Sequence, residues 1–211
     1  MMIAARDAII YIVDDDAAVR DSLALLLGLR GYATQSFATA EAFLEAVDAE
    51  HPGCVLLDLR MPGMDGLAAQ ARMAARGIAM PIIVLTAHGD AASARASLKA
   101  GAFDFLEKPA DEALLVKTIE GALAAAAEAR ASAERREAFL WRLGRLTPRE
   151  REIFDHIVRG RHNREIAVDL AISPRTVEVH KARLMDKLGV DRMAEMYRIA
   201  MDLGLMPEPP R

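Results

Sequence analysis

Short apolar runs alternate with amphipathic helical patterns along residues 8–120. The runs are rich in Ile, Val and Leu and show little apolar–polar alternation, so they predict strands buried on both faces. They lie at 8–13, 33–37, 54–58, 81–86 and 102–108, of which 33–37 is the weakest. Continuous apolar strands separated by helices are typical of a parallel sheet with helices on both faces. We therefore expect a doubly wound α/β domain with five parallel strands.

From Thr147 onward the pattern is purely helical. Thr147 and Glu150 have the spacing of a capping box, and Pro148 suits the first position of a helix. We expect the three following helices to be capped at Asn163, Ser173 and Asp191. Short helices of this kind form a small all-α bundle. The turn expected at 170–175, between a short helix and a longer polar one, predicts a helix-turn-helix.

Residues 121–146 connect the two patterns and are rich in Ala, Glu and Arg. The stretch has no turn chemistry before Gly144, so we expect the last helix of the α/β domain to continue as a helical linker. Its end is too apolar to be free and should dock on a domain or on a second chain. The apolar residues there are Phe139, Leu140, Trp141 and Leu143. The expected domains are 7–125 (α/β), 126–145 (linker) and 146–204 (helical).

Composition narrows the class of protein further. The chain has 211 residues and a single Cys, which cannot form an internal disulfide and fits a reducing compartment. Cys54 lies in an apolar run, where we expect it to act as a small buried hydrophobe. The first residues are too few and too charged for a signal peptide, and no apolar run approaches the roughly 18 residues of a membrane span. We expect a cytoplasmic protein that has no membrane partner.

The charge is divided unevenly between the two halves. Residues 1–128 carry 10 Lys and Arg against 18 Asp and Glu, whereas residues 129–211 carry 17 against 13. An acidic half joined to a basic half indicates separate tasks, and the basic half is suited to a polyanion.

Polar residues follow the apolar strands at the carboxyl ends, where open parallel sheets bind their ligands. These residues are Asp14, Asp15, Asp16, Asp58, Thr86 and Lys108. A cluster of carboxylates suits Mg²⁺, whose charge offsets their repulsion. A lysine and a hydroxyl beside Mg²⁺ would stabilise a transferring phosphoryl group, and an Asp can itself accept that group.

Four motifs carry a resemblance: "VDDD" (13–16), "LLDLRMPGMDG" (56–66), "VLTAHGD" (84–90) and "GAFDFLEKP" (101–109). In this order they resemble the receiver domains of two-component response regulators, over about residues 8–125. The resemblance implies a flavodoxin-like fold with Asp58 as phosphoacceptor. It implies Mg²⁺ binding by Asp15, Asp58 and the backbone carbonyl of Arg60, with Asp14 acting largely through water.

The same resemblance implies further roles. Thr86 and Lys108 would contact the phosphoryl oxygens, and Phe105 would be the aromatic switch that moves with Thr86. The Lys108–Pro109 peptide bond is expected to be cis. Ala110 replaces the aromatic residue usual after this motif, and Asp16 stands where Glu is common. We expect Asp16 only to neighbour the site and to favour the next helix electrostatically.

The segment "LTPREREIFDHIVRGRHNREIAVDLAISPRTVEVHKARLMDKLGVDR" (146–192) resembles the LuxR-type helix-turn-helix. With a receiver, it implies the FixJ/NarL subfamily of response regulators, closer to the FixJ side. On the second helix, Val177, Leu184 and Leu188 share a face that should be core. By resemblance Glu178, Val179 and Ala182 face bases, and Arg175, Thr176, Lys181 and Arg183 contact the DNA backbone. Ala171 stands where Gly is usual, which costs roughly 1 kcal/mol if the turn needs a positive φ.

The two resemblances imply a phosphorylation-dependent transcription regulator and not an enzyme that turns over a substrate. The expected partners are a sensor histidine kinase, double-stranded promoter DNA, RNA polymerase and, after phosphorylation, a second copy of the chain. Dimerisation would use the face at about residues 90–107. Two alternatives remain at this stage. One is a Mg²⁺-dependent phosphatase with an aspartyl-phosphate intermediate, although "LLDLRMP" lacks the D-x-D of haloacid-dehalogenase-type enzymes. The other is a receiver whose helical domain binds a protein.

Overall fold

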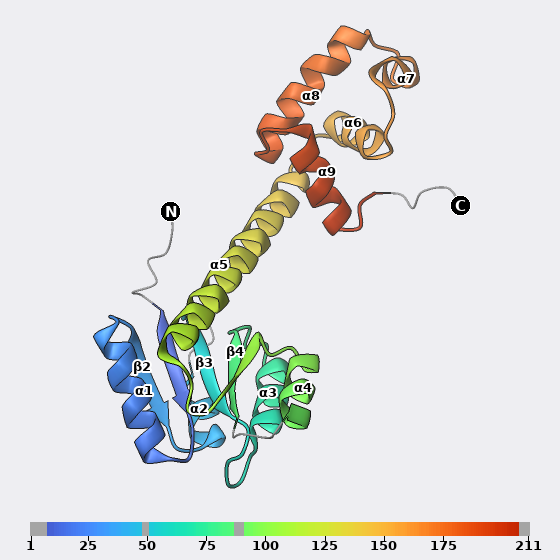
Figure 1. The fold of residues 1–211 in the computed structure, drawn as a ribbon. Helices are drawn as coiled ribbons and strands as arrows, with labels where there is room; N and C mark the ends of the chain where they lie inside the picture. Colours follow the sequence, from blue (N-terminus) through green and yellow to red (C-terminus); the bar gives the residue numbers. More distant parts are fainter. Residues whose placement is uncertain (1–7, 48–50, 87–90, 207–211) are drawn as a thin grey trace. The chain divides into compact units, whose positions relative to one another are not determined.

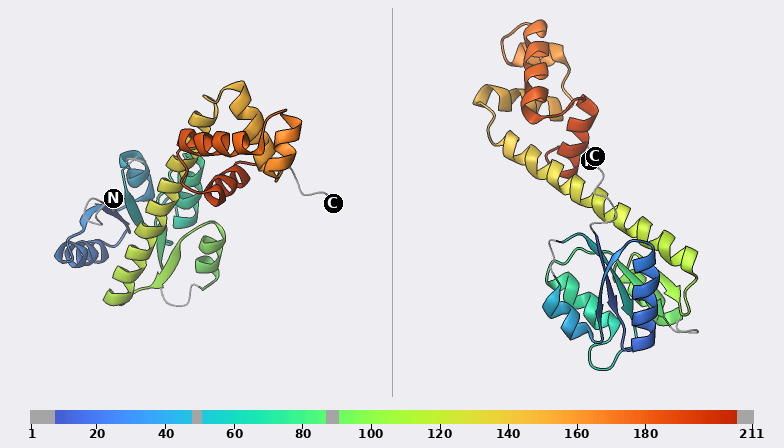
Figure 2. Two further views of the ribbon diagram at one scale, coloured as in Figure 1. Left: turned by 90° about the horizontal axis from the view of Figure 1, so that it is seen from above. Right: turned by 90° about the vertical axis from the view of Figure 1, so that its left-hand side faces the viewer.

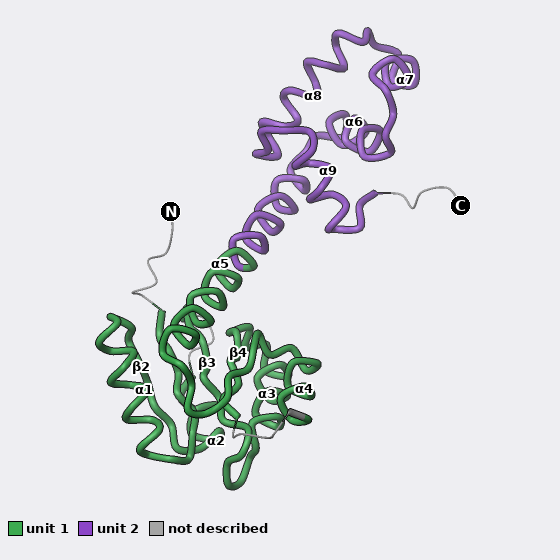
Figure 3. The backbone as a smooth tube through the Cα atoms, viewed as in Figure 1, with its two compact units in different colours: residues 1–129 green, residues 130–211 purple. Residues whose placement is uncertain are grey.

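The computed structural model describes residues 8–47, 51–86 and 91–206, which fall into two compact units (Figures 1 and 3). Unit 1 comprises Met1–Ala129 and unit 2 comprises Arg130–Arg211. No helix among these described residues is long and apolar enough to cross a membrane.

Unit 1 contains a five-stranded parallel sheet with the order β2-β1-β3-β4-β5. The strands are β1 (Ile9–Val13), β2 (Ala33–Phe37), β3 (Gly53–Asp58), β4 (Ile82–Thr86) and β5 (Asp104–Glu107). β1 pairs with β2 on one side and with β3 on the other, so the chain reverses its direction of winding between them. Such a switch point opens a crevice beyond the strand ends. The predicted doubly wound α/β fold is confirmed.

Helices cover both faces of this sheet (Figure 2). They are α1 (Ala17–Leu29), α2 (Ala40–Ala46), α3 (Gly66–Ala75), α4 (Ala91–Lys99) and α5 (Glu112–Leu143). Leu27 of α1 and Ile119 of α5 pack on one face, whereas Phe43 of α2 and Met73 of α3 pack on the other. Because the central strands are buried on both faces, they need the continuous apolar pattern seen in the sequence.

Cys54 lies in β3 and has no exposed surface. Burial raises the pKa of its thiol to about 12. The expectation that Cys54 is a small core residue is confirmed.

Unit 2 is entirely helical in its described part. Its own helices are α6 (Pro148–Val158), α7 (Asn163–Asp169), α8 (Pro174–Leu188) and α9 (Met193–Asp202). The capping box at the start of α6 is present, since Thr147 accepts from the backbone N–H of Glu150 and Glu150 accepts from that of Thr147. Ser173 likewise caps α8, by accepting from the N–H of Thr176 at 3.1 Å.

Two predicted N-caps in unit 2 are wrong by one residue. α7 is capped at His162 instead of Asn163, because Glu165 reaches back to the N–H of His162 at 2.7 Å. The side-chain oxygen of Asn163 accepts instead from Lys181 at 3.0 Å. α9 is capped at Arg192 instead of Asp191, without a side-chain hydrogen bond.

The last turns of α5 are part of unit 2. Phe139 and Leu143 are buried in its core, and the ring of Phe139 lies 6.3 Å from that of Phe154. Leu140 and Trp141 remain exposed, and the guanidinium of Arg145 lies 4.5 Å from the centre of the Trp141 ring. The predicted docking on a domain is therefore confirmed for Phe139 and Leu143, while α5 runs without a break to Leu143 as expected.

Candidate functional site

The ends of β1 and β3 bring three carboxylates together. Because these strands are neighbours and Val13 pairs with Leu57, the residues that follow lie side by side at one edge of the sheet. Ligand atoms of Asp14, Asp15 and Asp58 all lie within 4.8 Å of one another. Asp14 and Asp58 are buried, whereas Asp15 is exposed. The structure thus gathers the acids that the sequence placed at separate strand ends.

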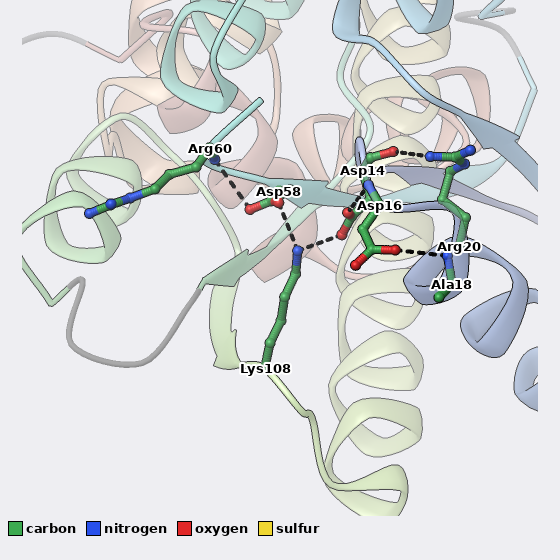
Figure 4. A network of polar contacts seen from close by, with 7 residues as sticks. All are labelled: Asp14, Asp16, Ala18, Arg20, Asp58, Arg60 and Lys108. Carbon is green, nitrogen blue, oxygen red and sulfur yellow. Dashed lines mark hydrogen bonds and ion pairs between the residues drawn. The ribbon is translucent and has the colours of Figure 1, made fainter. Parts of the chain in front are cut away.

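Lys108 lies between the two buried carboxylates (Figure 4). Its Nζ is 2.5 Å from Oδ2 of Asp14 and 2.7 Å from Oδ2 of Asp58. The backbone N–H of Lys108 donates to the carbonyl of Thr86 at 2.8 Å, which fixes the end of β5 beside β4. The peptide bond to Pro109 is cis, as the resemblance implied.

Burial and charge act against each other in this cluster. Burial raises the pKa of the Asp14 carboxyl, and this outweighs the lowering by Lys108 and by the N–H of Asp16. Burial alone would lower the pKa of Lys108, but its hydrogen bonds to Asp14 and Asp58 and their charges outweigh it, and the net shift is upward. The ammonium is therefore charged at neutral pH and offsets the repulsion between the carboxylates.

The donor set fits Mg²⁺. Three carboxylates within 4.8 Å offer the hard oxygen ligands that this cation prefers, and exposed Asp15 leaves one side open to water. The backbone N–H of Arg60 donates to Oδ1 of Asp58 at 3.2 Å, so the residue expected to contribute a carbonyl ligand is tied to the cluster.

Asp16 has a different task, because its carboxylate accepts from the backbone at the start of α1 (Figure 4). It is the N-cap of α1, and its Oδ1 accepts from the N–H of Ala18 at 2.8 Å. Its own N–H donates to Oδ1 of Asp14 at 3.0 Å. Asp16 therefore links the start of α1 to the acidic cluster, in addition to the electrostatic effect that the sequence suggested.

Thr86 and Phe105 lie on the neighbouring strands. Thr86 ends β4, one residue beyond the Leu85 that pairs with Asp58, and it is buried. Phe105 lies in β5, and 37% of its surface is exposed. Residues 87–90, which complete one of the sequence motifs, lie outside the described residues.

Two residues of this region were not found by sequence reasoning. A Cβ on Gly66 would lie 2.4 Å from the carbonyl oxygen of Asp58 and 2.8 Å from Cα of Leu59, so only glycine lets α3 begin so close to Asp58. Glu41 of α2 accepts from the N–H of Met64 at 3.0 Å and so holds the loop between β3 and α3. Gly66 could have been noticed because glycine is unusual at the first position of a helix. The sequence around Glu41 gives no indication of its contact with Met64.

In unit 2, α8 exposes one face and buries the other. Val177, Leu184 and Leu188 are buried, as predicted. Of the residues predicted to contact DNA, the structure leaves five exposed: Arg175, Glu178, Val179, Ala182 and Arg183. Thr176 and Lys181 are half-buried and have partners: Oγ1 of Thr176 lies 2.8 Å from Oγ of Ser173, and Lys181 donates to Asn163.

The turn before α8 is strained. Ala171 has a φ of 52° and is the non-glycine residue with a positive φ among the described positions. The turn does need the left-handed region, and alanine adopts it there at a cost of about 1 kcal/mol. The guanidinium of Arg149 donates to the carbonyl of Leu170, the preceding residue, at 2.7 Å.

Comparison with known proteins gives matches to both units. Residues 10–120 match the response regulator receiver domain, and residues 145–200 match the luxR family of bacterial regulatory proteins. The chain is 41% identical to the transcriptional regulatory protein FixJ of Bradyrhizobium diazoefficiens, over 93% of this chain and 96% of that protein. It is 38% identical to the transcriptional regulatory protein TdiR of Thauera aromatica, over 95% of this chain and 91% of that protein.

Solved structures agree with these matches. The response regulator StyR is similar with a TM-score of 0.73 and 37% identity, over 93% of this chain and 99% of that chain. Full-length FixJ from B. japonicum has a TM-score of 0.59 and 40% identity, over 95% of this chain and 98% of that chain. Both family resemblances expected from the sequence are confirmed.

Proposed function

Because the chain belongs to the response regulators that join a receiver domain to a LuxR-type DNA-binding domain, and is thus a phosphorylation-dependent transcription regulator, we propose that Asp58 accepts the phosphoryl group. The observation that carries this proposal is the position of Asp58, buried at the end of β3 and 2.7 Å from Nζ of Lys108. A carboxylate so placed can attack a phosphorus atom while a fixed cation takes up charge on the phosphoryl oxygens.

The transfer needs little covalent chemistry from the protein. The bond from phosphorus to an imidazole nitrogen of a sensor kinase breaks, and a bond to an Asp58 oxygen forms. Receiver domains bind Mg²⁺ at this acidic pocket, and here its ligands would be Asp15, Asp58 and the Arg60 carbonyl, with Asp14 through water. Bound Mg²⁺ supplies charge neutralisation to the transferring group. Lys108 and the hydroxyl of Thr86 would contact the other phosphoryl oxygens.

Phosphorylation would then shift a two-state equilibrium. In the proposed active state Thr86 moves towards the phosphoryl group, and the half-exposed ring of Phe105 moves with it. To change the populations from about 1:99 to 99:1, the new dianion must favour the active state by roughly 5.5 kcal/mol. We expect the face at about residues 90–107 to dimerise; Asp90 lies outside the described residues.

The proposed target of the helical unit is promoter DNA. Glu178, Val179 and Ala182 would read base edges, while Arg175, Thr176, Lys181 and Arg183 would contact phosphates. Dimerisation would place two such helices on a two-fold site, near RNA polymerase. With DNA as its target the protein would work in the cytoplasm, and it would be modified itself instead of turning over a substrate.

Asp58→Ala tests this proposal. With acetyl phosphate and Mg²⁺, the unchanged protein should form dimers in light scattering and bind its promoter more tightly, whereas Asp58→Ala should do neither. Glu45→Ala is a matched control, because it removes an exposed carboxylate of α2 that lies outside both the acidic cluster and residues 90–107. Phosphodonor-dependent dimers of Asp58→Ala would contradict the mechanism. Steady release of phosphate from small esters would favour a phosphatase, and a complete lack of DNA binding would favour a protein-binding output.

A further inference from the structure

The C-terminal end of α8 is held by a residue of another helix. Arg142 of α5 donates from Nη1 to the carbonyl oxygen of Leu188, the last residue of α8, at 3.1 Å. Figure 1 shows the last turns of α5 beside this end of α8 within the same unit. A guanidinium here satisfies a carbonyl that has no partner within the helix, and its charge suits the negative end of the helix dipole.

Gly189 leaves room for this contact. It has a φ of 67°, in the left-handed region that ends many helices. A Cβ at this position would lie 1.7 Å from Nη1 of Arg142 and 2.6 Å from its Cζ. The guanidinium therefore occupies the space that any other side chain would need, so the backbone favours glycine here and the contact with Arg142 requires it.

Arg142 is itself fixed by its neighbours on α5. Phe139 and Leu143, on either side of it, are buried in the core of unit 2. Arg142 is half-buried, so its guanidinium is not one of many freely moving surface charges. Arg142 therefore extends from a helix segment that is packed in the core of unit 2. It contacts the C-terminal end of α8, the helix whose exposed face is proposed to read DNA.

We propose that Arg142 is a positioning residue for DNA recognition, which fixes the C-terminal end of α8 and thereby the register of its exposed face against the bases. This inference rests on the proposed function of α8. The other end of the helix-turn-helix has its own anchors, Arg149 on Leu170 and Lys181 on Asn163. Lys187 near the end of α8 pairs with Glu150 at 2.6 Å, but half of the Lys187 side chain is exposed, so this pair fixes the end less firmly.

The position of α8 matters more for bases than for phosphates. Hydrogen bonds to base edges require a defined geometry in the groove, whereas phosphate contacts depend mainly on charge and tolerate small shifts. Loss of the Arg142 contact should therefore lower the affinity for the correct sequence more than the affinity for unrelated DNA.

The test compares Arg142→Ala with Arg145→Ala in the full chain, with acetyl phosphate and Mg²⁺. Both variants remove one positive charge, but Arg145 is exposed and contacts Trp141. The probes are a genomic fragment selected by the unchanged protein and a shuffled duplex of equal length. Arg142→Ala should lower the ratio of the two affinities roughly tenfold, whereas Arg145→Ala should change it by less than about twofold.

Gly189→Asn gives an independent check, because Asn tolerates the left-handed region but its Cβ displaces the guanidinium. It should lower the affinity ratio as Arg142→Ala does, and the double variant should lower it no further. An unchanged ratio in Arg142→Ala, or equal losses on both probes, would overturn the inference while the proposed function stands. Absence of DNA binding by the unchanged protein would overturn the proposed function and this inference with it.

Discussion

The aspartates in and beside the acidic cluster have different roles. Asp14 and Asp58 are buried and share the ammonium of Lys108, Asp15 is the exposed member, and Asp16 caps a helix. Three identical residues that follow one another in the sequence, Asp14, Asp15 and Asp16, thus lie in different physical environments. Alternation along an extended chain turns neighbouring side chains in different directions, and hydrogen bonds then fix each direction.

This division predicts different effects for two neighbouring substitutions. Asp15→Ala should abolish phosphorylation, since it removes a proposed direct Mg²⁺ ligand. Asp16→Ala should retain phosphorylation but lower the free energy of unfolding by roughly 1 kcal/mol, because α1 loses its cap. A phosphate-affinity gel after incubation with acetyl phosphate measures the first effect, and urea unfolding measures the second. Equal loss of phosphorylation in both variants would contradict the division.

Glu150 predicts how the stability of the helical unit depends on pH. The hydrogen bond from Lys187 and that from the backbone of Thr147 lower the pKa of Glu150 from 4.5 to about 2. Because the pKa is lower in the folded state, the charged form stabilises the fold above about pH 4.5, and this contribution is lost as the pH falls towards 2.

Glu150→Gln should therefore lower the free energy of unfolding by roughly 1 kcal/mol at pH 7, and the difference should shrink between pH 4.5 and pH 2. The fluorescence of Trp141, the single tryptophan, can follow urea unfolding. Glu152→Gln removes the same charge from an exposed position of α6 and should have a smaller effect. A difference at Glu150 that persists unchanged at pH 2 would show that charge is not its cause.

At the scale of elements, the close start of α3 against the end of β3 makes Gly66 sensitive. Gly66→Ala would force its Cβ against the backbone of Asp58 and Leu59, so phosphorylation should slow and unit 1 should lose stability. Gly28→Ala is the control, because nothing lies within 4 Å of its Cβ position in α1. It should stabilise the protein by up to about 1 kcal/mol. The phosphorylation rates and the unfolding curves of both variants measure these effects. If Gly66→Ala behaved like Gly28→Ala, the close contact between α3 and β3 would not be important for either property.

Elements were predictable where their signal is local. Five apolar runs gave the five strands of the sheet, and the Thr147 capping box gave the start of α6. The caps of α7 and α9 were each misplaced by one residue. At α7 the cause is that Asn163 is engaged by Lys181, 18 positions away in sequence. Glu41, Gly66 and Arg142 were missed for the same reason. Each acts on a residue of another element, and such contacts leave no pattern of spacing along the chain.

At the scale of the whole molecule, charge separates two tasks along one chain. The acidic cluster lies in the half with 18 Asp and Glu against 10 Lys and Arg, and α8 lies in the half with the basic excess. The matched families cover both halves, and the FixJ and TdiR proteins are similar over more than nine-tenths of this chain. The proposed cation site and the proposed polyanion-binding site can therefore coexist in a protein of modest net charge.

This separation predicts how salt affects DNA binding. Arg183→Ala should reduce the slope of log K against log salt by about 1, because one phosphate contact is lost. Val179→Ala should leave the slope unchanged but relax the sequence preference, since Val179 is proposed to contact a base. Titrations of a selected promoter fragment at several salt concentrations measure both. A changed slope in Val179→Ala with no change in Arg183→Ala would reverse the two assigned roles.

Cys54 makes the opening of the sheet measurable. Its thiol has no exposed surface and a pKa of about 12, so a thiol reagent can react only while β3 separates from its neighbours. As the only cysteine of the chain, it gives a modification rate that reports one event. Comparing the rate of thiol modification with and without a phosphodonor would measure how much phosphorylation of Asp58, at one end of β3, suppresses the opening of that strand.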